Sequence, residues 1–218
     1  MLKTERMDRV RAALRAQGLT QMIVCDPKSV WYLTGVAVEP YERLLALYLP
    51  TEGEPVLFLN RLFNVPEPPC RTVWHTDTDK PVAQIAEVVD AGRPLGIDKE
   101  WPAKFLIPLM ETHPGMQVVL SSDCVDDCRA CKDAEEQALM REASRINDAV
   151  NEAAKHYIKA GMTEREVAEF IDAQFRAHGC EGPSFTAIVS FGANAADPPN
   201  EPDDDVCKDG GCVKYDMG

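Results

Sequence analysis

The chain has 218 residues, of which 45% are hydrophobic and 27% charged, and its formal net charge is -13 at pH 7. This length suits one large or two small domains, and the composition is that of a globular protein. The acidic balance excludes nucleic-acid binding, which needs a basic surface. No apolar run is long enough to span a bilayer, and the charged first ten residues do not form a signal peptide, so we expect a cytoplasmic protein without a membrane partner.

Helical and extended patterns alternate through the first part of the chain. Apolar residues at Met7, Val10 and Leu14 predict a helix that ends at Gly18. Two later strand patterns flank the turn segment TEGE and predict a β-hairpin. The five predicted strands here cover residues 19–26, 29–36, 43–50, 55–60 and 71–76.

The next segments predict a helix and then a βαβ unit. Val82, Ile85 and Val89 lie on one face of a helix for which Asp79 is the expected N-cap and Gly92 the end. The βαβ unit comprises a strand, a helix and a strand at residues 94–98, 101–112 and 116–122. The first domain is therefore an α/β domain with a mixed sheet over residues 1–121.

The second part, residues 122–218, has a different pattern. A long helix is expected from residue 122 to about 160, with its apolar positions at Leu139, Ala143, Ile146, Val150, Ala153 and Tyr157. Thr163 and Glu166 form a capping box for a second helix. Strands are expected at residues 184–191 and 212–218. Two helices and two strands are few for a closed core, so we expect these residues to be the first part of a larger domain.

Three cysteines, Cys124, Cys128 and Cys131, form the one cluster that suggests a metal. A zinc or iron–sulfur site needs a fourth ligand, and none stands at a regular spacing. The alternative is a buried stripe of small apolar side chains, because the three positions have the spacing i, i+4, i+7 on a helix. We favour packing, and without a secretion signal we expect no disulfide framework.

The residues around the Asn-Ala-Ala segment resemble a known family. The strand SFTAIVSF, the loop GANAADPPNEPDDD and the strand CVKYDMG are similar to the pita-bread metallopeptidases of the creatinase, aminopeptidase P and prolidase family. SVWYLTGV resembles that family's N-terminal domain, and CRACKDAEE corresponds to its domain-joining helix. The resemblance implies a creatinase-type N-terminal α/β domain over residues 1–121 and an incomplete α+β pita-bread domain over residues 122–218.

The resemblance also implies an activity. Members of this family cleave the bond next to proline in short peptides, use two divalent ions such as manganese, cobalt or zinc, and form homodimers. Two hard cations need anionic oxygen ligands, and the water that they bind is a nucleophile near neutral pH. Asp216 in KYDMG matches the first aspartate ligand of the family's metal site.

Two departures from the family pattern bear on catalysis. Pro199 and Asn200 occupy the positions of the family's loop histidines, and neither side chain can transfer a proton near neutral pH. The remaining four metal ligands of the family lie beyond the Asp-x-Gly strand. None of the four histidines in the chain matches the ligand histidine: His75, His113, His156 and His178.

We therefore identify no catalytic residue, and we expect the 218-residue chain to be inactive and to hold no metal stably by itself. An alternative of a different class is a non-catalytic module of the same fold that binds peptides or proteins, or that forms dimers. The choice among dipeptidase, aminopeptidase and creatinase-like activity stays open at this point.

Overall fold

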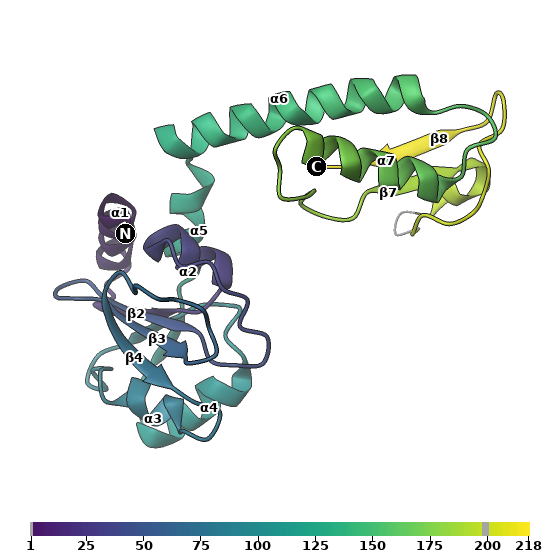
Figure 1. Cartoon of the computed structure of the whole chain (residues 1–218). Coiled ribbons are helices and arrows are strands. Elements are labelled where there is room, and N and C mark those ends of the chain that lie inside the picture. Colours follow the sequence, from purple (N-terminus) through teal and green to yellow (C-terminus); the bar gives the residue numbers. More distant parts are fainter. Residues whose placement is uncertain (1, 198–200) are drawn as a thin grey trace. The chain divides into compact units, whose positions relative to one another are not determined.

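The computed structural model describes residues 2–197 and 201–218. The chain divides into two compact units, unit 1 at residues 1–132 and unit 2 at residues 133–218 (Figure 1). Within the described ranges, no helix combines the length and the apolar character that a membrane crossing requires.

Unit 1 is built on a six-stranded sheet with the order β4-β3-β2-β1-β5-β6. β2 is antiparallel to β1 and β3, whereas β1–β5, β5–β6 and β3–β4 are parallel pairs. The predicted mixed sheet, its hairpin and its βαβ unit are confirmed. The strands are β1 (Gln21–Val24), β2 (Ala46–Pro50), β3 (Val56–Asn60), β4 (Arg71–His75), β5 (Leu95–Ile97) and β6 (Val118–Leu120).

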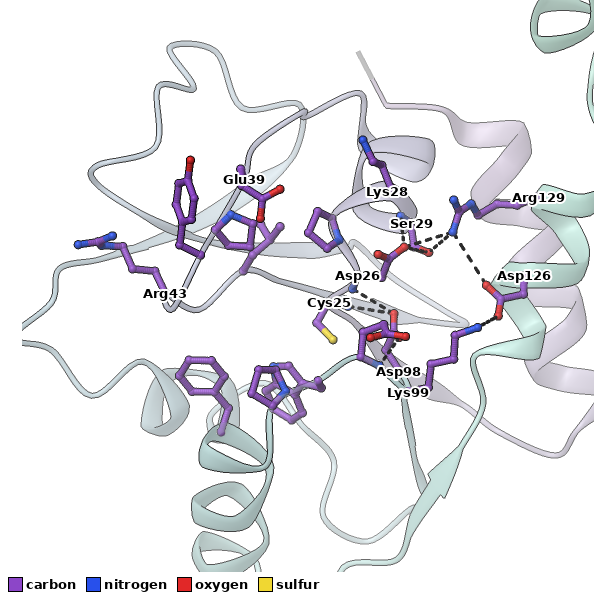
Figure 2. A pocket seen from close by; sticks show the side chains of 18 residues that line it. Cys25, Asp26, Lys28, Ser29, Glu39, Arg43, Asp98, Lys99, Asp126 and Arg129 are labelled. Atoms are coloured by element: carbon purple, nitrogen blue, oxygen red, sulfur yellow. Dashed lines mark hydrogen bonds and ion pairs between the residues drawn. The ribbon is translucent and has the colours of Figure 1, made fainter. Parts of the chain in front are cut away.

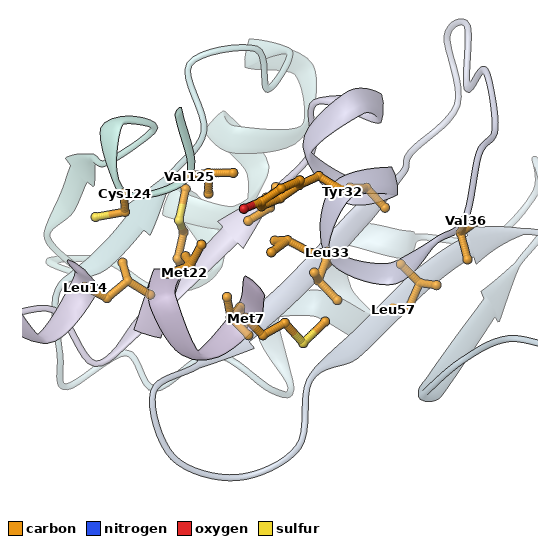
Figure 3. Packing of buried hydrophobic residues seen from close by; sticks show 14 of the residues in the cluster. Met7, Leu14, Met22, Tyr32, Leu33, Val36, Leu57, Cys124 and Val125 are labelled. Atoms are coloured by element: carbon orange, nitrogen blue, oxygen red, sulfur yellow. The ribbon is translucent and has the colours of Figure 1, made fainter. Parts of the chain in front are cut away.

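Helices cover both faces of this sheet (Figure 1). The sheet has a hydrophobic core on each face. Alternate residues of β1 belong to different cores, because successive side chains of a strand point to opposite faces. Met22 and Val24 pack with the helices α1 (Thr4–Ala16), α2 (Pro27–Thr34) and α5 (Asp123–Ala130). Figure 3 shows Met22 among residues of these helices, such as Leu14, Leu33 and Val125. Ile23 packs with α3 (Pro81–Ala86) and α4 (Ala103–Thr112) on the other face. Each such fully buried side chain contributes about 1.5–3 kcal/mol.

The segment 29–36 is not the strand that its sequence predicts, because most of it belongs to α2. The side chain of Asp26 accepts a hydrogen bond from Ser29 N at 2.8 Å, and Pro27 stands at the first helical position. Gly35 ends the helix with a left-handed backbone, at φ 75°. These two end signals outweigh the high strand propensity of the side chains between them.

The cap predicted for the α3 helix is also wrong. Lys80 is the N-cap, and the carboxylate of Asp79 accepts hydrogen bonds from Thr76 N and Thr76 Oγ1 instead. Asp79 therefore stabilises the turn that precedes the helix, as short acidic side chains often do.

The long helix expected over residues 122–160 is two helices, α5 and α6 (Ala134–Tyr157). They separate because Asp133 starts α6 with a capping box, in which its side chain accepts from Glu136 N and the Glu136 side chain accepts from Asp133 N. α5 packs in the unit 1 core, although the sequence predicts that residues 122–130 belong to the second domain. Leu139 was expected on the buried face of the helix and is 66% exposed.

The cysteine cluster follows this division. Cys124 is buried in the unit 1 core and Cys128 packs against it, whereas Cys131 lies beyond the end of α5 and is exposed. Burial raises the pKa of the Cys124 thiol to about 11, so it stays protonated at neutral pH. The packing interpretation therefore holds for Cys124 and Cys128, which contact the unit 1 core, and fails for Cys131, which does not lie on the helix.

Unit 2 packs two helices on a two-stranded antiparallel sheet. α6 and α7 (Glu164–Ala177) contribute Val150, Ala154, Val167, Ile171 and Phe175 to its core. The sheet consists of β7 (Ile188–Phe191) and β8 (Val213–Asp216). The rings of Tyr157 and Phe170 stack with centroids 3.8 Å apart, which fixes one helix against the other.

Candidate functional site

Asp216 is the last residue of β8 and pairs with Ile188, the first residue of β7. Its side chain is exposed. Two contacts hold the end of the strand in place: Tyr215 Oη donates to Asn151 Oδ1 at 2.7 Å, and Ser184 N donates to Gly218 O at 2.6 Å. Asp216 thus presents a carboxylate from a fixed backbone.

The Asn-Ala-Ala segment continues directly from β7. Residues Gly192–Ala196 form a short 3₁₀ helix, in which Gly192 has a φ of 53° and donates its N–H to Cys212 O. Asn194 therefore lies close to the start of β8. Pro199 and Asn200, the positions at which the family has histidines, lie outside the described residues.

Glu164, the first residue of α7, holds this loop together. The residue is fully buried, and its carboxylate accepts hydrogen bonds from the backbone and from a side chain. Oε1 accepts from Phe191 N at 2.6 Å and from Asn194 Nδ2 at 3.1 Å, while Oε2 accepts from Asp203 N at 3.2 Å. The N-terminal end of a helix also favours a negative charge at this place. One carboxylate therefore joins β7, the 3₁₀ helix and the acidic segment.

The acidic run at residues 203–205 has exposed side chains but not a free backbone. The first N–H groups of a helix have no partner within it. Here Glu164 N donates to Asp205 O and Arg165 N to Asp203 O, both at 3.1 Å. The backbone of this run therefore provides the hydrogen-bond acceptors that the start of α7 needs.

Glu164, Asp203 and Asp205 place carboxylate oxygens within 4.8 Å of one another. Each of these carboxylates already accepts a hydrogen bond from an N–H group. Asn194 Nδ2 donates to Asp205 Oδ2 as well as to Glu164, and Asp205 N donates to Asp203 Oδ1. The hydrogen bonds that hold the loop in place thus explain why these carboxylates lie together, and no cation is needed to explain it.

His156 and His178 lie in unit 2 with Asp216, and among the described residues neither joins it in a group of three or more potential metal ligands. Each of the four histidines lies within hydrogen-bonding distance of a backbone carbonyl oxygen, at Leu44 for His75, Ala86 for His113, Glu152 for His156 and Gln174 for His178. His75 is the one that is buried, and it lies at the end of β4 in unit 1.

Sequence reasoning missed Glu164. The same helix start was recognised from Thr163 and Glu166, whose capping box the structure contains. A glutamate in the first turn of a helix is common, so its type and position alone give no sign of burial. The hydrogen-bond partners of Glu164 are distant in sequence, so only the folded structure reveals that this side chain is buried among them.

An α/β unit followed by two helices, an Asn-Ala-Ala loop and a strand that ends in aspartate defines a class, the prolidase-like metallopeptidases. Two family models match the chain: Creatinase/Prolidase N-terminal domain over residues 6–131, and Metallopeptidase family M24 over residues 138–218. The chain belongs to metallopeptidase family M24.

Relatives of known structure share the fold over the whole chain. A dipeptidase PepE from Mycobacterium ulcerans is 28% identical with a TM-score of 0.87, and 99% of this chain aligns with 60% of that one. A prolidase from Thermococcus sibiricus is 26% identical with a TM-score of 0.89, and 100% of this chain aligns with 62% of that one. An uncharacterized peptidase of Staphylococcus aureus is 30% identical over 89% of this chain and 56% of its own length. The chain thus spans about three fifths of these relatives.

Proposed function

We propose that this chain is part of a peptidase that hydrolyses the bond next to proline in short peptides. The observation that carries the proposal is the position of Asp216, which ends β8 beside the Asn-Ala-Ala loop in a chain that belongs to family M24. The prolidase and dipeptidase relatives support peptides as substrates. A homodimer and a cytoplasmic location complete the proposal.

The carboxylate of Asp216 is a suitable ligand for a divalent ion such as manganese, cobalt or zinc. One carboxylate is, however, too few ligands for a pair of such ions. An exposed carboxylate at a fixed strand end is a suitable ligand for a hard cation. Among the described residues, the other close group of carboxylates is the Glu164 cluster, which already accepts N–H donors. When bound, the ions would supply an activated water. One carboxylate does not hold them, so the role of Asp216 here is to offer the first ligand.

The 218-residue chain alone should therefore not hydrolyse an Xaa-Pro dipeptide. The test incubates the purified chain with alanyl-proline and added manganese, and measures free proline. Turnover above the buffer blank would refute this part of the proposal. The source reading frame beyond the codon for Gly218 provides the complementary test. The family interpretation requires an aspartate, a histidine and two glutamates in that region.

A second candidate is a binding or dimerisation module without catalysis. It is favoured by Pro199 and Asn200, which replace the loop histidines of the family. Restoring histidine at both positions in a metal-loaded protein that carries all five ligands distinguishes the two functions. The peptidase interpretation expects a gain in kcat. An unchanged inactive protein would favour the binding module.

A further inference from the structure

The strands of unit 1 bring several chain segments to one edge of the sheet. Because β2 alone runs in the opposite direction, the carboxyl ends of the other five strands share this edge. Cys25 and Asp98 follow β1 and β5, and Leu45 precedes β2. In open α/β sheets, ligands bind in crevices outside the carboxyl ends of the strands.

A cavity of about 450 Å³ lies at this edge. A second cavity of about 300 Å³ shares the lining residues Arg43 and Phe105 with it, so the two cavities are neighbours. Small-molecule sites typically measure about 300–1,000 Å³. Figure 2 shows Asp26, Asp98 and Arg129 on one side of the larger cavity, opposite Arg43 and Glu39.

The polar side of the cavity is held rigid by its own hydrogen bonds (Figure 2). Asp98 accepts from Cys25 N at 3.3 Å, Asp26 N at 3.2 Å and Glu100 N at 3.0 Å. The carboxylate of Asp26 accepts from Arg129 Nη1 at 3.2 Å. A ligand would therefore meet a preformed wall rather than one that it must order.

The charges around the cavity favour a cation. Lys99, Arg129 and Arg43 each form an ion pair with a carboxylate of the protein. Among the described residues, no ion pair involves Glu39 or Glu100, and both are exposed. The lining contains the acids Asp26, Glu39, Asp98, Glu100 and Asp126 and the bases Lys28, Arg43, Lys99 and Arg129. With most bases neutralised, the free acids determine the local field.

Aromatic side chains line the same cavity, from Tyr41, Trp101 and Phe105. Aromatic faces attract organic cations, and the Phe105 ring already lies 4.9 Å from Nζ of Lys104. Trp101 is only 6% exposed, yet its Nε1–H has no hydrogen-bond acceptor within the described parts of the chain. A buried donor without a partner is costly, so a small rotation of the indole that brings this N–H to an acceptor on a ligand would be favourable.

We propose that this cavity binds a small organic cation, a guanidinium or alkylammonium group whose carbon chain carries a carbonyl. The charged group lies between the aromatic side chains and the carboxylates of Glu39 and Glu100. The carbonyl accepts the Trp101 Nε1–H. The aromatic lining selects against bare metal ions, which require converging oxygen ligands. The cavity lies in unit 1, whereas Asp216 belongs to unit 2.

The experiment uses the 218-residue chain and L-argininamide, which combines a guanidinium group with a carbonyl. The readout is the indole N–H resonance of Trp101 in a ¹⁵N spectrum, together with calorimetry. We expect a shift that saturates at about 1–10 mM. Agmatine retains the guanidinium without the carbonyl and should bind more weakly and move this resonance less. L-citrullinamide, in which a neutral ureido group replaces the guanidinium, should bind much more weakly.

Variants separate the site from a general attraction to an acidic protein. Replacing Glu39 and Glu100 together by glutamine should weaken L-argininamide binding about fivefold to tenfold, because both are surface charges beside the cation. Glu111→Gln removes a charge from an exposed position of α4 outside the lining and should change binding less than twofold, as roughly expected for a distant screened charge. Equal effects of the two changes, equal binding of L-citrullinamide, or an unmoved Trp101 resonance would overturn the proposal.

Discussion

Replacing Glu164 by glutamine should loosen the Asn-Ala-Ala loop while the rest of the protein keeps its structure. The carboxylate accepts from Phe191 N, Asn194 Nδ2 and Asp203 N. Glutamine keeps one acceptor oxygen but turns an N–H₂ group towards a donor. A hydrogen bond to a charged group contributes about 1.5–3 kcal/mol, and a buried donor left unpaired costs about 1–3 kcal/mol. We therefore expect unit 2 to lose about 3 kcal/mol.

Hydrogen exchange measured by mass spectrometry is the suitable assay, because it reports each segment separately. A loss of about 3 kcal/mol should accelerate exchange about 100-fold at the amides of Phe191 and Asp203, if opening is local. All three tryptophans, Trp31, Trp74 and Trp101, lie in unit 1. The urea midpoint measured by their fluorescence should therefore not change.

Glu166→Gln is the matched control, since it makes the same chemical change two residues later on an exposed side chain. Its capping-box contact to Thr163 N should cost only about 0.5–1 kcal/mol. Equal exchange in the two variants would show that Glu164 has no special role in the loop. A lower fluorescence midpoint for Glu164→Gln would show that its effect is not confined to unit 2.

Four further predictions concern unit 1 and the contrast between the units. Gly96→Ala should destabilise unit 1 by about 1–3 kcal/mol in urea unfolding, because the new Cβ would lie 2.4 Å from Ser121 Oγ and 3.2 Å from Gln21 O; an unchanged midpoint would contradict this packing. Alkylation should modify the exposed Cys131 and Cys212 long before Cys124. Burial raises the pKa of Cys124 from its ordinary value of 9.0 to about 11, so the stabilising contribution of this thiol is present below pH 9.0 and is lost as pH rises towards 11. Cys124→Ala should therefore flatten the alkaline decline in stability. Finally, amides after residue 180 should exchange faster than those before residue 120, since unit 2 has only a two-stranded sheet; equal protection would mean that unit 2 closes its own core.

Much of the fold follows from local patterns in the sequence. Alternating and continuous apolar runs located the six strands of unit 1, because burial on both faces of a sheet leaves a clear signature. The pattern failed at α2, where Val30, Trp31 and Tyr32 have strand propensity but two helix ends, Asp26 and Gly35, decide the structure. End signals were thus more informative than the composition between them.

The sites were harder to predict, because their residues come from distant parts of the chain. Glu164 reaches partners 27, 30 and 39 residues away. Arg129 and Asp26, which meet at the cavity of unit 1, are separated by 103 residues. No local pattern encodes such contacts. Asp216 was identified from its family resemblance, and its role as a metal ligand stays a prediction.

Because β2 alone is reversed, the two ends of the unit 1 sheet differ in how well they tolerate substitutions. At one end, the turn after β2 is tied to α1, since Arg11 donates to Pro50 O and Gly53 O and Arg15 to Thr51 O. At the other end, loops surround the cavity and contribute few of the hydrogen bonds that pair the strands. Substitutions in those loops can therefore alter what the cavity accepts without disturbing strand register, so that related proteins can diverge in ligand while keeping one framework.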